Sequence, residues 1–454
     1  MTESRRSAAD RLLNKLRASA DAPSAKIEKP RRSTQSIVGR KAADFTALPE
    51  YQALRVQRAM ADMLKIEVPF FRPHEGRAAD TTVIGGRTAL NFSTYDYLGL
   101  NGDPRVVEAA KQAIDRYGTS VGASRPTAGE RAIYRELETA LARFHNTEDA
   151  LCFVSGHATN VSVIGSLLSS KDVIFADAFA HNSIIEGAKL SGATCLIFPH
   201  NDLDALEALV RENRSRFRRA MIAVEGLYSM DGDVCDLARL IAIKRHFDAW
   251  LLVDEAHSSG VLGERGRGIA EEQNIDPGEV EIWMGTLSKA FVSTGGYIAG
   301  SRPLIEFLKT HCPGFVYSVG MPPAMAAAAL AALQIIKGEP DRVAALRANG
   351  SLFLQRARAA GLDVGQSIGA SIVPVIVGDT PMTVVLSNRL LNHGLYVTPI
   401  IFPAVGAKQG RLRFFITSRH TQEQIEAAVD LTAQELSKLR KEPPLIANLS
   451  QGGG

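Results

Sequence analysis

Four polar clusters in this 454-residue chain each come directly after a short apolar run. Apolar runs separated by helical stretches are typical of buried parallel strands, and ligands in open α/β folds bind at the carboxyl ends of such strands. We therefore expect the clusters to meet at one edge of a sheet. They are Ser155-Gly156-His157, Glu225 to Asp231, Asp254 to His257, and Thr286 to Lys289.

The segment WLLVDEAH places Asp254 at the end of a predicted buried strand. A carboxylate there can face the ring nitrogen of pyridoxal phosphate and keep it protonated, which makes the ring an electron sink. His257 follows three residues later and can share the site. The structural alternative is a strand-terminal Asp that caps a helix. A DEAH-box helicase is not indicated, because no GxxxxGK phosphate loop precedes the segment.

The segment IWMGTLSKAF supplies Lys289 just beyond another apolar run. A lysine in that position is partly desolvated, which lowers its pKa and favours an imine with an aldehyde. Thr286 and Ser288 offer hydroxyls to a phosphate. By itself the segment also fits a surface lysine. Because the same strand-to-loop context holds Asp254 35 residues earlier, the pair favours a cofactor site.

Two further segments suit an anion and a planar ring. Ser155-Gly156-His157 opens a predicted helix, whose N-terminus favours an anion, and glycine lets the backbone approach closely. His181, in DAFAHNSIIEG, follows another short strand, where an imidazole can lie flat over a ring. Each signal alone also fits an ordinary αβ turn or a capping histidine. Together with Asp254 and Lys289 they point to one site.

The predicted elements that position these residues alternate along the chain. Helical spacing predicts helices over 45–64, 203–214 and 237–246, and a buried packing helix within 321–336. Apolar runs predict strands at 150–153, 173–176, 195–198, 221–224, 250–253, 282–284 and 297–299. This alternation predicts a mostly parallel sheet covered on both faces. After residue 336, strand-like pieces at 371–377 and 411–417 and a final helix predict a smaller α+β domain.

These patterns divide the chain into five parts. They are a basic extension (1–44), an N-terminal segment (45–105), a large domain (106–335), a small C-terminal domain (336–440) and a disordered tail (441–454). Residues 1–41 carry eleven Lys/Arg and four Asp/Glu, within an overall charge of +3. A solvated flexible arm, docking to an acidic carrier domain and contact with an anionic membrane surface all fit this extension. Nucleic acid is not indicated, because no recognition pattern accompanies the charge.

Composition points to a cytoplasmic enzyme without a metal. The four cysteines show no CxxC or metal-ligand spacing, as expected of reduced thiols. No apolar run is long enough to span a membrane, and no signal-peptide core is present near the start.

Several motifs together resemble the α-oxoamine synthase family of fold-type I pyridoxal-phosphate enzymes, and the serine palmitoyltransferase type most of all. They are YDYLGL, GTSVGASRPTAGE, HNSIIEG, EGLYSMDGD, VDEAHSSGVLGERGRG and GTLSKAF. The resemblance runs from about residue 45 to 439 in the family's order. It implies an α/β fold with a mostly parallel central sheet and a smaller C-terminal domain.

The resemblance also implies roles for the residues that hold the cofactor, pyridoxal 5'-phosphate. Lys289 would form the imine, Asp254 would face the ring nitrogen, and His181 would stack on the ring. His257 would bond the ring 3-hydroxyl, with Ser229 nearby. The phosphate would be held by backbone groups of Gly156 and His157, by the hydroxyls of Thr286 and Ser288, and by Ser318 of a neighbouring subunit. The last role implies a homodimer with shared active sites.

The resemblance also implies that two residues bind the substrate. Arg413, in GRLRFFI, resembles the arginine that binds the amino-acid carboxylate. Tyr95, in FSTYDYLGL, stands at a position where the chain resembles serine palmitoyltransferases more than oxononanoate synthases, which carry Asn. Arg411 could be confused with Arg413, because strand alternation puts both on one face. Tyr134 and His157 depart from the family's usual histidine and aromatic residue, which indicates a less common branch.

The activity implied is decarboxylative condensation of an amino acid with an acyl thioester, from acyl-CoA or an acyl carrier protein. L-serine and a long-chain acyl group are preferred, giving a 3-oxo-sphingoid base, with L-alanine or glycine as the alternative amino acid. Two other classes stay open: a fold-type I aminotransferase, and an inactive partner subunit. Retention of Lys289 argues against the second.

Overall fold

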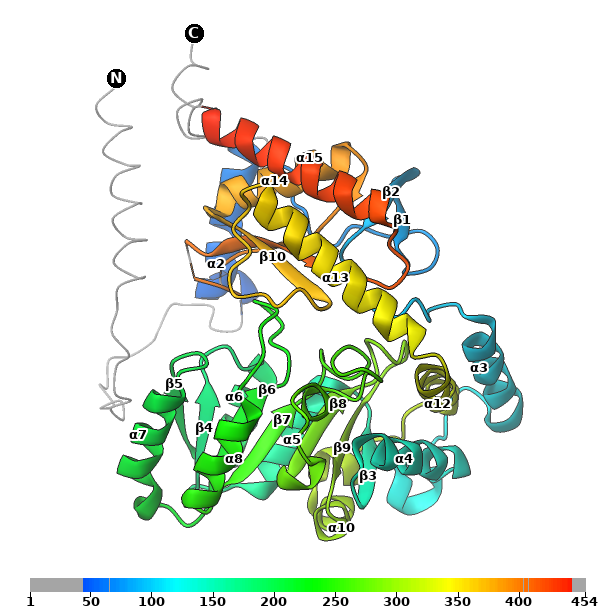
Figure 1. Ribbon diagram of the computed structural model, residues 1–454. Helices are drawn as coiled ribbons and strands as arrows, with labels where there is room; N and C mark the ends of the chain where they lie inside the picture. The colour runs from blue at the N-terminus through cyan, green and yellow to red at the C-terminus, as the bar shows by residue number, and fades with distance from the viewer. Residues whose placement is uncertain (1–43, 65, 403, 407, 443–454) are drawn as a thin grey trace. The chain divides into compact units, whose positions relative to one another are not determined.

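The computed structural model describes residues 44–442 except 65, 403 and 407 (Figure 1). The expectations for the basic extension and the tail therefore lie almost entirely outside the described residues. The chain forms two compact units that divide after Met60. In the first, the short helix η1 (Phe45–Ala47) begins at Asp44, whose Oδ1 accepts a hydrogen bond from Thr46 N–H at 2.9 Å. Helix α2 (Pro49–Met63) follows, as the periodicity of 45–64 predicts.

The second unit is built on a seven-stranded sheet with the strand order β3-β9-β8-β7-β6-β4-β5. The strands are β3 (Asp149–Phe153), β4 (Val173–Asp177), β5 (Thr194–Phe198), β6 (Ala220–Glu225), β7 (Trp250–Asp254), β8 (Ile282–Thr286) and β9 (Gly296–Gly300). The five strands β5, β4, β6, β7 and β8, which are neighbours in that order, pair in parallel. Strand β9 lies between β8 and β3 and runs antiparallel to both. All seven predicted strands are confirmed, and so is the mostly parallel sheet.

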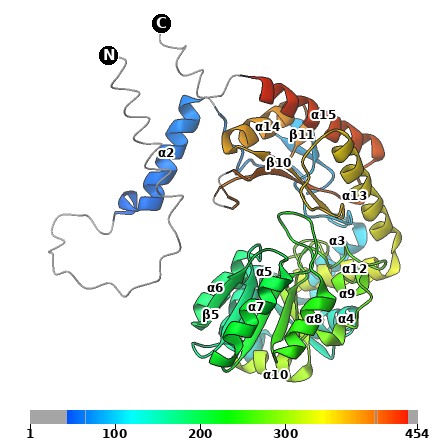
Figure 2. The ribbon, with the colours of Figure 1, turned by 60° about the vertical axis from the view of Figure 1, so that its left-hand side comes forward.

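Helices cover both faces of this sheet, because successive strand residues point to opposite sides. On β6, Met221 and Ala223 join one apolar cluster, whereas Ile222 and Val224 join the other. The first cluster contains residues of α5 (Gly156–Leu167), α6 (Asn182–Ser191), α10 (Arg302–His311) and α11 (Pro313–Val316). The second contains residues of α4 (Ala132–His145), α7 (Leu203–Asn213), α8 (Leu237–His246), α9 (Ile269–Glu272) and α12 (Pro323–Gly338) (Figure 2).

A second, smaller layer follows α12. The antiparallel sheet β10-β13-β12 consists of β10 (Ile372–Gly378), β12 (Pro399–Ile400) and β13 (Gly410–Phe415). It is accompanied by α13 (Asp341–Ala359), α14 (Thr380–Asn392) and α15 (Gln422–Lys441). This is the α+β arrangement that the sequence predicts for the C-terminal part. Three further short helical segments are η2 (Arg125–Gly129), η3 (Arg214–Arg216) and η4 (Pro277–Glu279).

The N-terminal segment pairs with the C-terminal part, which the sequence pattern does not reveal. Strands β1 (Thr81–Ile84) and β2 (Arg87–Asn91) form a hairpin, and β11 (Leu395–Tyr396) pairs in parallel with β2. Gly85 and Gly86 have φ angles of +56° and +75°, which a two-residue hairpin turn of this hand requires. Helix α3 (Pro104–Tyr117) then packs against α12.

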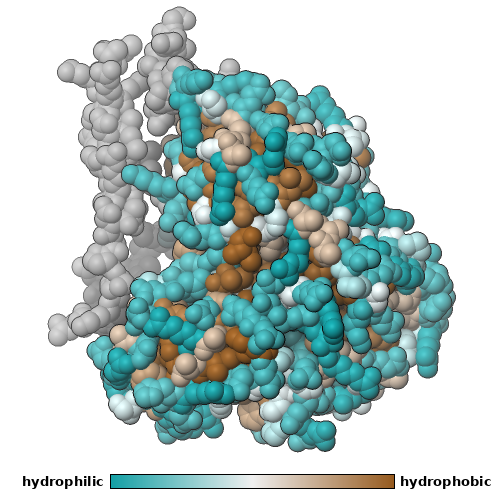
Figure 3. All heavy atoms as spheres, in the orientation of Figure 1, coloured by the Kyte–Doolittle hydropathy of each residue, from teal (hydrophilic) through white to brown (hydrophobic). Residues whose placement is uncertain are grey.

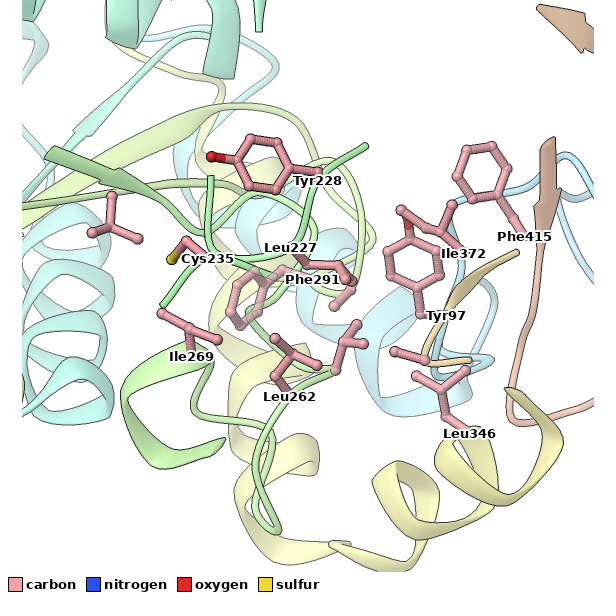
Figure 4. Close-up of a cluster of buried hydrophobic side chains, with 14 of the residues drawn as sticks. Tyr97, Leu227, Tyr228, Cys235, Leu262, Ile269, Phe291, Leu346, Ile372 and Phe415 are labelled. Carbon is pink, nitrogen blue, oxygen red and sulfur yellow. The ribbon is translucent and has the colours of Figure 1, made fainter. Parts of the chain in front are cut away.

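Apolar side chains from distant parts of the second unit meet in one core. Figure 4 shows Tyr97 and Phe415 on one side of this cluster and Leu227, Tyr228 and Leu262 on the other. The face seen in Figure 3 is mainly hydrophilic over the described residues, with smaller apolar patches. Among the described helices, none has the length and apolar character needed to cross a bilayer.

Candidate active site

Asp254 ends β7 as a buried carboxylate whose two oxygens are both held. Its Oδ2 accepts a hydrogen bond from Asn160 Nδ2 at 2.8 Å, and its Oδ1 accepts one from Ala256 N–H at 2.9 Å. Asn160 lies on α5 and also donates from Nδ2 to Ser183 Oγ at 3.0 Å. Sequence reasoning assigned no role to Asn160, although it stands one helical turn after Gly156. The carboxylate therefore keeps a fixed orientation at the carboxyl edge of the sheet.

Lys289 lies in the loop that follows β8, partly buried beside this carboxylate. Burial lowers the pKa of its amine to about 8, although the negative charges of Asp254 and Glu225 oppose the shift. Its Nζ lies 5.7 Å from the centroid of the Tyr95 ring. A substantial fraction of this amine is therefore neutral near neutral pH, unlike that of an ordinary lysine.

Glu225, at the end of β6, is a buried acid that the sequence argument did not single out as a site residue. Burial, followed by the neighbouring charge of Asp254, raises its pKa to about 8. Its Oε2 accepts a hydrogen bond from Ser229 N–H at 3.0 Å, whereas Oε1 has no partner among the described residues. Two carboxyl groups at neighbouring strand ends thus flank the site, and only Asp254 is held at both oxygens.

The two predicted ring-binding histidines are both neutral. Burial lowers the pKa of His181, which begins α6 and contacts Ser183 Oγ through Nδ1 at 2.7 Å. Burial, Lys289 and Arg413 place the pKa of His257 well below its usual range. His257 Nδ1 lies 2.7 Å from the hydroxyl of Tyr97, a buried partner that no sequence spacing indicates.

The N-terminus of α5 lies against the end of β8. Ser155 caps α5 by accepting a hydrogen bond from Ala158 N–H at 3.1 Å. Thr286 Oγ1 lies 2.8 Å from Ser288 Oγ. A Cβ at Gly156 would lie 2.9 Å from Thr286 Oγ1, so a side chain there would crowd this contact. The His157 ring lies beside His181, with the ring centroids 6.2 Å apart.

Strand alternation places Arg411 and Arg413 on the same face of β13, but their contacts in the structure differ. Arg411 Nη1 contacts Asp231 Oδ1 at 2.7 Å, which neutralises its charge in a buried pair. Arg413 Nη1 donates instead to the backbone oxygen of Ser229 at 2.8 Å, and its buried Nε has no partner among the described residues. Of the two, Arg413 therefore has a charge available for a carboxylate.

Lys289, Ser288 and Tyr95 line one cavity of about 490 Å³. His74, Thr94, Ser293, Tyr396 and Thr398 also line it, so the N-terminal segment and both domains contribute. Tyr95 is 40% exposed, and its ring meets Phe415 edge-on at 4.8 Å. Ser318 lies elsewhere, lining a small cavity with Phe153, Val154 and Arg125. The structure thus gathers the predicted site residues except Ser318.

The chain matches the family model described as aminotransferase class I and II over residues 87–431. It is 36% identical to 8-amino-7-oxononanoate synthase of Bacillus pumilus over 365 residues, covering 80% of this chain and 92% of that protein. The enzyme of the same name from Treponema denticola is 38% identical over 357 residues, with 79% and 90% covered.

Solved structures of serine palmitoyltransferases are also similar. The S. paucimobilis protein with bound PLP and myriocin superposes with a TM-score of 0.83 at 27% identity, covering 87% of this chain and 99% of that one. The Sphingomonas wittichii protein gives 0.82 at 29% identity, with 88% and 100% covered.

Proposed function

This chain belongs to the aminotransferase class I and II family and, within it, to the α-oxoamine synthases, and we propose that it condenses L-serine with a long-chain acyl thioester. The products are a 3-oxo-sphingoid base, carbon dioxide and the free thiol. The family match and the similar proteins named above confirm the expected family, fold type and cofactor class. The observation that carries the proposal is the buried Arg413, which has no carboxylate partner among the described residues. Its charge acts on Lys289, as does that of Asp254.

The residues present fit pyridoxal 5'-phosphate. Lys289 offers an amine of lowered pKa to the aldehyde, and Asp254 offers a held carboxylate to the ring nitrogen. The α5 N-terminus, left open by Gly156, suits a phosphate. When bound, the cofactor supplies an electron sink for the charge that develops at the substrate Cα. His181 and His257, both neutral, would line the ring without adding positive charge.

The chain's own groups would then divide the work. Lys289 Nζ would accept the substrate Cα proton. Arg413 would hold the substrate carboxylate, and Asp254 would keep the proton on the ring nitrogen. Anchoring the carboxylate would fix the orientation of the substrate Cα, and orientation of this kind can contribute about 7–11 kcal/mol at most.

The choice of L-serine is supported by the similarity to serine palmitoyltransferase structures and by Tyr95 beside Lys289. L-alanine is the second candidate, because the oxononanoate synthases named above are more identical in sequence than those structures, at 36% and 38% against 27% and 29%. The test crosses Ser, Ala and Gly with short and long acyl-CoA and acyl carrier protein, followed by mass spectrometry. A decarboxylated product only from alanine would refute the serine assignment.

An aminotransferase is the competing class. With amino acid alone, a transaminase yields the 2-oxo acid, whereas a condensing enzyme needs the thioester and releases carbon dioxide. We expect no oxo acid from serine alone and thiol release only when both substrates are present. Rapid oxo-acid formation without thioester would favour the aminotransferase. An inactive partner subunit would show neither reaction and would fail to retain the cofactor on Lys289 after borohydride.

We also propose a homodimer in which Ser318 reaches the partner's phosphate site. In support, Ser318 stands in an exposed segment between α11 and α12, where Tyr317 is 84% exposed and Val319 51%. Light scattering of the purified protein would test the dimer. Mixing Lys289→Ala and Ser318→Ala subunits would test the shared site, because a mixed dimer should regain one complete site.

A further inference from the structure

A histidine in the turn between β5 and α7 lies between two carboxylates. His200 Nδ1 contacts Asp177 Oδ1 and Nε2 contacts Asp233 Oδ2, both at 2.8 Å. A neutral imidazole has one N–H and could donate to only one of them, whereas an imidazolium donates to both. Burial opposes that charge, but the hydrogen bonds that the ring donates to Asp177 and Asp233 raise the pKa of His200 to about 10. The ring is therefore a cation at neutral pH.

Aromatic groups hold the same ring from two other sides. Phe179 stacks on it with centroids 4.2 Å apart, and Tyr228 meets it edge-on at 4.5 Å. The charged and titratable groups in contact with His200 are thus Asp177 of β4, Asp233 of the β6–α8 loop and the Tyr228 phenol. Asn201 donates hydrogen bonds to the same two carboxylates. Its backbone N–H donates to Asp177 Oδ2 at 2.9 Å, and its Nδ2 donates to Asp233 Oδ2 at 2.7 Å.

The two carboxylates belong to loops that carry site residues. Asp177 ends β4, four residues before His181, and its Oδ1 also accepts from Phe179 N–H at 2.7 Å. Asp233 lies four residues after Ser229, and its backbone oxygen accepts from Tyr228 N–H at 2.9 Å. One turn, which itself contains no residue of the site, therefore joins the loop of His181 to the loop of Ser229.

We propose that His200 is a positioning residue whose imidazolium ties the β4–α6 turn to the β6–α8 loop, so that His181 and Ser229 face the cofactor together. This rests on the proposed function, since it assigns both loops to one cofactor. The His200 clamp, defined as His200 with Asp177 and Asp233, contacts the site only through these loops. Its effect should therefore be felt in cofactor geometry and affinity before it is felt in substrate contacts.

The test titrates apo-protein with pyridoxal 5'-phosphate and records absorbance and visible circular dichroism. His200→Gln keeps a polar side chain but removes the charge, and we expect cofactor affinity to fall about tenfold or more, as for one lost hydrogen bond to a charged group. We also expect a weaker dichroic band from the bound cofactor and a lower kcat with little change in the thioester KM. His311→Gln, an exposed histidine on α10, is the matched control and should behave as wild type.

A purely structural role would give a different result. If His200→Gln lowered the unfolding temperature but left cofactor affinity and dichroism unchanged, the clamp would be refuted. If His200→Gln did not fold, Asp233→Asn gives the same answer through a milder change. It should lower the pKa of His200, so that cofactor affinity relative to wild type, compared at each pH, falls through the range in which the variant's His200 loses its proton. Unchanged affinity across that range would equally overturn the proposal.

The controls separate this inference from the proposed function. Failure of wild type and His311→Gln to bind the cofactor would sink the function itself. Normal binding by these two proteins together with normal binding by His200→Gln would sink only the clamp.

Discussion

The two edges of the central sheet differ in chemistry more than in shape. The amino edge holds a cavity of about 540 Å³ beside Trp250, Ile282 and Phe307, larger than the one of about 490 Å³ that contains Lys289. Yet its acids are satisfied: Glu148 accepts from Arg302 N–H at 2.7 Å, and Glu281 accepts from Leu251 N–H at 2.8 Å and pairs with Lys244.

At the carboxyl edge, polar groups are buried without full satisfaction. Glu225 and Arg413 each keep a buried atom without a partner among the described residues, and Lys289 has a lowered pKa. Such groups cost stability unless a ligand completes them. The comparison teaches that incomplete pairing of buried charge, and not cavity size, distinguishes the edge that holds the candidate active site. Variants at the two edges should therefore differ in whether they affect catalysis or stability.

The largest effect should come from Lys289→Ala, because the base and the covalent attachment point are lost together. We expect kcat/KM to fall on the order of 10³-fold or more, and borohydride should no longer fix the cofactor to the protein. Lys244→Ala, at the amino edge, should lower stability by breaking its pair with Glu281 but leave kcat nearly unchanged. Full turnover by Lys289→Ala would remove it from the site.

Asp254→Asn should come next. A neutral amide cannot hold the proton on the ring nitrogen, so we expect kcat to fall on the order of a hundredfold while Asn160 still contacts residue 254. Steady-state kinetics would measure the fall. Asp172→Asn, which weakens a pair with Arg218 at the amino end of β4, should affect the free energy of unfolding alone. Equal kinetic losses in the two variants would contradict the assignment.

The two arginines of β13 should respond differently. Arg413→Ala should raise the amino-acid KM about tenfold, the cost of one charge-assisted hydrogen bond. Arg411→Ala should instead lower the free energy of unfolding by about 3–5 kcal/mol, because Asp231 is left as an unpaired buried charge. Steady-state kinetics and urea unfolding would distinguish the two, and an exchange of these phenotypes would reverse the assignment.

Cofactor uptake by the apo-protein should depend on pH through the amine of Lys289. Because its pKa is lowered to about 8, the reactive neutral form increases as pH rises, makes up half of the amine at that pH and levels off above it. We expect the association rate to rise between pH 6 and pH 8 by about tenfold or more and then level off. Stopped-flow absorbance would measure it. A rate still climbing steeply near pH 10 would mean an unperturbed lysine.

The smallest effect should come from Arg219→Ala in the amino-edge cavity. Arg219 lies over the Trp250 ring at 5.6 Å and touches none of the predicted site residues. We expect stability to change by no more than about 0.5 kcal/mol, with kinetic constants unchanged. A marked loss of activity would mean that the two edges are coupled.

The sequence by itself determined the fold class, the seven strands of the central sheet and most of the residues of the candidate site. Strand and helix periods report burial directly, and every parallel strand delivers its following loop to the same edge, so Asp254, Lys289 and Gly156 could be brought together by local pattern alone. Their chemistry follows from residue type.

Only the tertiary structure decided which groups face one another across the chain. Arg411 and Arg413 share a strand face, and what separates them is Asp231, 180 residues earlier. The partners Tyr97 of His257, Asn160 of Asp254 and Asp233 of His200 also lie outside any local pattern, at 160, 94 and 33 residues along the chain. Local periodicity cannot show such pairs, because the free energy of a buried charge depends on partners that packing supplies and not on its neighbours along the chain.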